Sequence, residues 1–127
     1  MKFQKYQITL NREQAQTISK ALDFHSRIIG GQFQEIIDLF WDAKPENVKE
    51  AEKILTRLKY LLTGMGEDGN LGIGNISENG RNAYDLHQVI RHRLALDKPE
   101  SRHEFSVDFR SPSQYGTQPF AQIEGLE

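Results

Sequence analysis

Residues 77–96 read SENGRNAYDLHQVIRHRLAL, a helical pattern that combines a thin apolar stripe with many hydrogen-bonding side chains. The stripe consists of Ala83, Leu86, Ile90 and Leu94, which are three or four residues apart and therefore share one side of a helix. Polar side chains occupy a second face. The segment thus predicts a helix that packs through one face and offers the other to a partner.

Three more helices are predicted before this segment. Asn11, with Gln14 three residues later, forms the pattern of a capping box and begins a helix that ends at Gly30 and Gly31. A separate or kinked helix is expected from about Gln32 to Trp41. The cleanest amphipathic stripe follows from Pro45, with the apolar residues Val48, Ala51, Ile54, Leu55, Leu58, Leu61 and Leu62.

Three short strands are predicted around this helical block. Apolar and polar residues alternate over Gln4–Leu10, Phe105–Phe109 and Phe120–Ile123, as in half-buried strands. The glycine-rich stretch Gly64–Gly74 is expected to be a loop. The predicted fold class is therefore α+β, with about four helices packed on a small three-stranded antiparallel sheet.

Composition narrows the class of protein. A chain of 127 residues fits a single domain, which spans 1–127. The 16 Lys plus Arg nearly balance the 18 Asp plus Glu, so no overall charge would draw the protein to nucleic acid. The absence of Cys excludes disulfides and thiolate chemistry and suits a reducing compartment. No stretch resembles a signal peptide or a membrane span, so we expect a soluble intracellular protein.

An anion-binding site is predicted on the polar face of residues 77–96. Arginine offers a planar fork of donors to phosphate, and tyrosine offers a ring on which a base can stack. The candidate ligand-binding residues are Arg81, Tyr84, His87, Arg91, Arg93 and Arg110. Tyr115 and the backbone N–H groups of 72–75 could complete the pocket. The alternative is that the basic residues near the end of the helix only complement its dipole.

Catalytic, metal and cofactor sites are not expected. His87 and His92 are five residues apart and point in different directions on a helix, and no acidic pair is spaced for acid–base chemistry. The glycine-rich loop lacks the Gly-Lys-Ser/Thr signature of a Walker loop and follows a helix rather than a strand. The sequence therefore favours a binding protein over an enzyme, with no cofactor.

Three segments of the chain resemble one family. They are GQFQEIIDLF (31–40), NAYDLHQVIRHRLA (82–95) and HEFSVDF (103–109), together with LGIGN (71–75) before the second of them. In these segments the chain resembles small uncharacterised proteins encoded in phages and prophages of bacteria. The resemblance implies an accessory phage product in the host cytoplasm that acts on host or phage machinery by binding, and it transfers no catalytic residue.

Two functions fit that setting. The first is an anti-defence protein that sequesters a small nucleotide-derived signal at an Arg- and Tyr-lined site; the alternative is an inhibitor or adaptor that binds a host bacterial protein. A sequestering protein predicts a concave Arg- and Tyr-lined site, whereas an inhibitor predicts an exposed aromatic patch formed by Phe33, Phe40 and Trp41. Nucleic-acid binding is disfavoured because the basic stretch at 91–93 is small.

Self-association is also expected. The first three predicted helices carry more Ile, Leu, Phe and Trp than one thin sheet could cover. The sequence therefore predicts a homodimer or larger closed oligomer, formed most simply through helix faces related by two-fold symmetry.

Overall fold

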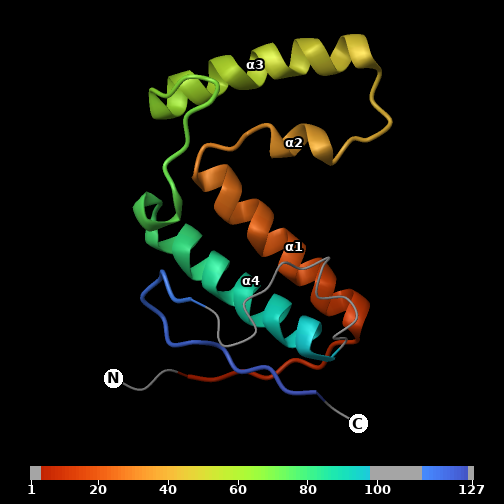
Figure 1. Cartoon of the computed structure of the whole chain (residues 1–127), viewed down its shortest axis with the longest axis vertical. Helices are drawn as coiled ribbons and strands as arrows, with labels where there is room; N and C mark the ends of the chain where they lie inside the picture. The colour runs from red at the N-terminus through yellow and green to blue at the C-terminus, as the bar shows by residue number, and fades with distance from the viewer. Residues whose placement is uncertain (1–3, 98–112, 126–127) are drawn as a thin grey trace.

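The computed structural model describes residues 4–97 and 113–125 (Figure 1). Its regular elements are α1 (Arg12–Ile29), α2 (Glu35–Asp38), α3 (Pro45–Thr63), a 3-10 turn η1 (Ile73–Asn75) and α4 (Glu78–Asp97). None of the helices in these ranges is both long enough and apolar enough to cross a bilayer.

Local signals explain where the helices begin and end. The Asn11 side chain accepts a hydrogen bond from the Gln14 N–H at 2.8 Å, and the Gln14 side chain accepts one from the Asn11 N–H at 3.0 Å, which confirms the predicted capping box. Pro45 occupies the first turn of α3, as predicted. Gly64 ends α3 in a left-handed conformation with φ 76°, which residues other than glycine rarely adopt.

The core lies where α1 and α4 pack side by side in antiparallel directions (Figure 1). Near the start of α1, Ala15 packs with Ile90 and Leu94 of α4. In the same region, Arg12 donates a hydrogen bond of 3.1 Å to the carbonyl oxygen of Leu94. The two helices are therefore joined by apolar burial and by a side chain that satisfies a carbonyl near the end of α4.

The predicted sheet is wrong for the described residues, which contain helices but no strand. Residues 4–10 and 120–123 form no regular secondary structure and no β-ladder, and Phe105–Phe109 lies outside the described residues. Instead, Leu10 and Ile123 pack against the α1–α4 core. The other apolar side chains of the first segment are exposed, Tyr6 at 84% and Ile8 at 76%, so the alternation did not mark a buried side. The observed part of the chain is helical rather than α+β.

The other half of the molecule is an arm formed by α2, the connection after it and α3, which we call the α2–α3 arm. Only four residues of the predicted helix from Gln32 to Trp41 are α-helical. In the described ranges, α2 is the only helix against which α3 packs appreciably, and α3 lies across the far end of α1 (Figure 1). The arm thus extends beyond the α1–α4 core.

Replacement of Gly80 should test the close approach of α1 and α4. A Cβ atom at Gly80 would lie 2.7 Å from Ile76 Cδ1 and 3.1 Å from Ile29 Cγ2. Gly80→Val should lower the free energy of unfolding in urea by about 2 kcal/mol because the helices must separate. Gly74→Val is the control, since a Cβ atom there meets nothing within 4 Å. Equal stability of the two variants would contradict this packing.

Candidate functional site

The polar face of α4 is covered by the chain's own C-terminal segment. The Asp85 carboxylate accepts hydrogen bonds from the Tyr115 N–H and the Gly116 N–H, each at 2.7 Å. Only 6% of Asp85 is exposed, so these two bonds compensate a buried charge. Residues 115–116 of the same chain thus cover part of the face that the sequence predicts to meet a partner.

We call the contact of Asp85 with residues 115–116 the clasp, and further polar contacts extend it along the segment. Asn82 accepts from the Thr117 N–H at 2.9 Å, and Gln88 donates to the Ser113 carbonyl oxygen at 3.0 Å. A Cβ atom at Gly116 would collide with the Asn82 side-chain oxygen. A residue without a side chain is therefore required where the segment comes closest to α4.

Asp85→Asn should release this segment. An amide at this position presents an NH₂ group in place of one acceptor oxygen, so one partly buried N–H of the segment loses its partner at a cost of about 1 kcal/mol. Hydrogen exchange measured by NMR should show faster exchange at Tyr115 and Gly116. Asp97→Asn, at the exposed end of α4, is the control. Unchanged protection in Asp85→Asn would exclude the clasp.

His87 lies between α4 and α1 rather than on an open ligand-binding face. Its Nδ1 is 2.9 Å from the Ser19 carbonyl oxygen and 2.7 Å from Ser19 Oγ. Because a carbonyl oxygen only accepts, this geometry assigns the hydrogen of the neutral ring to Nδ1. Ser19 and His87 are 6% and 7% exposed, so the pair joins the two helices and is shielded from a substrate.

The charge of His87 is controlled by its burial. Burial lowers the pKa of His87 below its ordinary value, and Arg91 also lowers it. Asp23, whose Oδ1 is 3.7 Å from Nε2, opposes this effect without overcoming it. The imidazole therefore gains a proton less readily in the folded protein than in the unfolded chain.

Stability should consequently fall in acid. Below about pH 6.5 the unfolded chain takes up a proton at His87 that the folded protein resists, so the melting temperature should drop as the pH falls through this region. His87→Gln should show a flatter profile from about pH 8 to 5. His25→Gln, at an exposed histidine of α1, should retain the wild-type slope. Identical slopes in all three proteins would contradict the assignment.

The other candidate ligand-binding residues do not form one cluster. Tyr84 is half-buried, and its ring lies 5.8 Å from the ring of Tyr115, so these two are brought together. Arg81 and Arg91 are separated by nearly three turns of α4, about 15 Å. Arg93 pairs with Asp97 at 2.9 Å, and Arg110 lies outside the described residues.

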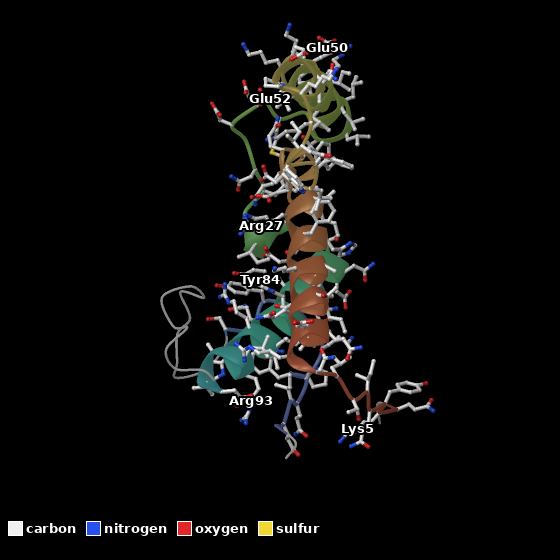
Figure 2. The ribbon with its side chains drawn as sticks, turned by 90° about the vertical axis from the view of Figure 1, so that its right-hand side faces the viewer. Lys5, Arg27, Glu50, Glu52, Tyr84 and Arg93 are labelled. Carbon is white, nitrogen blue, oxygen red and sulfur yellow. The ribbon has the colours of Figure 1, made fainter. Side chains whose placement is uncertain are left out.

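Tyr84 instead lines a small hollow between α1 and the loop before α4, where Gly72 and Ile73 also lie. The hollow measures about 170 Å³ and is lined by Arg27, which the sequence analysis did not identify as a site residue. Arg27 is bound to Asp23 at 2.9 Å and to Glu35 at 3.3 Å. Figure 2 shows Tyr84 just below Arg27, in the middle part of the molecule. Two neighbouring carboxylates make this hollow unfavourable for an anion.

A second hollow, of about 250 Å³, lies between the last turns of α4 and the C-terminal segment. Arg93 and His92 line it together with apolar residues such as Phe120 and Ile123. Ligand pockets usually occupy about 300 to 1,000 Å³. Both hollows are therefore smaller than a typical nucleotide site.

The α2–α3 arm carries the most exposed large apolar side chains outside the N-terminal segment. Trp41 is 90% exposed and Leu62 is 68% exposed, while Phe33 is buried. We call the exposed apolar set the arm surface, and it consists of Leu39, Phe40, Trp41, Ile54, Leu58, Tyr60, Leu61 and Leu62. Isolated exposed apolar residues are ordinary, but this set is confined to one short part of the chain.

One signal in the sequence could have revealed the arm surface. Apolar neighbours at Ile54–Leu55 and Leu61–Leu62 widen the stripe of α3 beyond what one packing partner can cover. In the structure, Leu55 is buried while Ile54, Leu61 and Leu62 are exposed. The stripe is wide, and interpreting all of it as core concealed that most of it is exposed.

Comparison with known proteins adds no further identification. No protein-family model, curated protein or solved structure matches the chain. Among residues 4–97 and 113–125, no group of three or more His, Asp or Glu side chains is arranged to hold a metal ion. The resemblance to phage-encoded proteins stays a prediction.

Proposed function

We propose that this protein is a non-catalytic binding protein that docks its arm surface on another protein and acts as an inhibitor or adaptor. In the setting that the phage resemblance implies, the target is a protein of the bacterial host. The observation that carries the proposal is the arm surface itself, above all Phe40 and Trp41, which face solvent.

Burial of these side chains would supply the binding energy. Each large apolar side chain that moves from water to a protein interior gains about 1.5 to 3 kcal/mol before the costs of association are subtracted. Tryptophan is also enriched among the residues that dominate protein interfaces. The arm surface thus has the chemistry of a protein-docking site, and an exposed aromatic patch is what distinguishes an inhibitor from a ligand trap.

Sequestration of a nucleotide signal receives less support. The two hollows are small, and Arg81, Arg91 and Arg93 are spread along and around α4. The arginine that does lie beside Tyr84 is Arg27, which is already paired with carboxylates. The geometry therefore favours a protein target over a nucleotide.

Affinity capture from a bacterial lysate tests the proposal. The wild-type protein should retain a specific host protein, and Phe40→Ser/Trp41→Ser should lose it because the aromatic anchors are gone. The matched control is Tyr6→Ser/Ile8→Ser, which removes apolar side chains that are 84% and 76% exposed from the N-terminal segment. That segment lies at the opposite end of the molecule from the arm (Figure 1).

Direct binding of the captured protein to the purified chain then completes the test. We expect the arm variant to lose binding while its melting temperature stays near that of the wild type, since exposed substitutions usually change stability by about 0.5 kcal/mol or less. Retention of the same protein by all three chains, or of none by the wild type, would contradict the proposal.

A further inference from the structure

We infer that one side of α4 is a peptide-binding site, which the chain's own C-terminal segment (113–125) occupies as an internal competitor. The ligand that fits this site is an extended segment of another protein with consecutive backbone N–H groups and a Gly-Thr pair. The site lies on α4, whereas the arm surface lies at the other end of the molecule (Figure 1). It is therefore a binding function separate from the one proposed above.

Four polar side chains form this surface, which we call the α4 site. They follow one another at intervals of four, three and three residues, so they share one side of the helix. The four are Glu78, Asn82, Asp85 and Gln88. Each of them forms a hydrogen bond with residues 113–118. A stripe whose every member contacts the same short segment is suited to recognise an extended chain.

The α4 site contacts mainly the backbone of its ligand. Asp85 accepts hydrogen bonds from the first two N–H groups of residues 115–118, and Asn82 accepts from the last two, at 2.9 and 3.3 Å. Two side chains thus satisfy four consecutive N–H groups. Because every residue except proline carries this donor, a segment of another protein can form the same bonds.

Two positions give the α4 site a sequence preference. A Cβ atom on Gly116 would lie 2.9 Å from Asp85 Oδ2 and closer still to the Asn82 side-chain oxygen, so a larger residue does not fit there. The hydroxyl group of Thr117 donates to the Glu78 carboxylate. The preferred ligand therefore has a glycine followed by a residue with a hydroxyl group.

The C-terminal segment is bound in a way that permits exchange. Its large side chains bury only part of their surface, since Tyr115 is 39% and Phe120 is 40% exposed. The hollow of about 250 Å³ beside Phe120 shows that the segment does not fill the space along α4. The segment competes well because it is tethered close to the site, and another peptide binds only those molecules in which it is released.

Fluorescence anisotropy with a labelled peptide of residues 113–124, SQYGTQPFAQIE, tests the α4 site. In the full-length variant Gly116→Val the tethered segment no longer fits, so the site is open. This variant should bind the peptide at least about tenfold more tightly than the wild type, in which the tethered segment competes. A peptide that carries Gly116→Val should bind neither protein.

Two further variants test the acceptors on α4. Asn82→Ala/Asp85→Ala/Gly116→Val should bind the peptide at least about tenfold more weakly than Gly116→Val, because four N–H groups lose their partners. Asn47→Ala/Glu50→Ala/Gly116→Val is the matched control, since it removes an exposed amide and an exposed carboxylate at the same spacing from α3. It should bind like Gly116→Val.

Hydrogen exchange in the wild type completes the test without any substitution in the protein. An excess of the peptide should speed up exchange of the tethered Tyr115 and Gly116 amides, because the peptide displaces them from Asp85. Equal affinity of the wild type and Gly116→Val, binding of the Gly116→Val peptide, or unchanged exchange of the tethered amides would each overturn the inference.

Discussion

The antiparallel contact between α1 and α4 forms the core and positions the polar face of α4 that binds the C-terminal segment. The Ser19–His87 hydrogen bonds fix how the two helices face each other, and Ala15, Ile90 and Leu94 exclude water beside them. With one side of α4 held in this way, its polar side is free to bind the C-terminal segment through Asp85. A helix with a thin apolar stripe is thus enclosed from two directions, one apolar and one polar.

The two halves of the molecule therefore differ: the α1–α4 half pairs its polar groups within the chain, and the α2–α3 arm leaves apolar side chains exposed. Polar groups of α4 reach backbone partners on the C-terminal segment, and the hollows beside this helix are small. The α2–α3 arm, in contrast, exposes aromatic and aliphatic side chains and pairs few of its charges within the described ranges. Apolar surface of this kind is stable in water only at a cost, and docking of another chain removes that cost.

Helix ends were predictable because their determinants are local. The Asn11–Gln14 capping box, Pro45 and the glycines after α1 act within a few residues. The strands predicted at 4–10 and 120–123 were wrong because alternation is a local pattern that does not supply a pairing strand, and Tyr6 and Ile8 are exposed in the structure. The partner of the α4 polar face could not be deduced either, since nothing in the composition of residues 113–118 marks them as the partner of Asp85.

The central claim is that the polar groups of the α1–α4 half are paired within one chain, whereas the α2–α3 arm packs less extensively and leaves apolar side chains exposed. Hydrogen exchange measured by NMR tests it directly, because exchange reports how often each helix opens. Amides of α1 and α4 should be strongly protected, and amides of α3 should exchange faster. Protection of α3 that equals that of α1 would contradict the account.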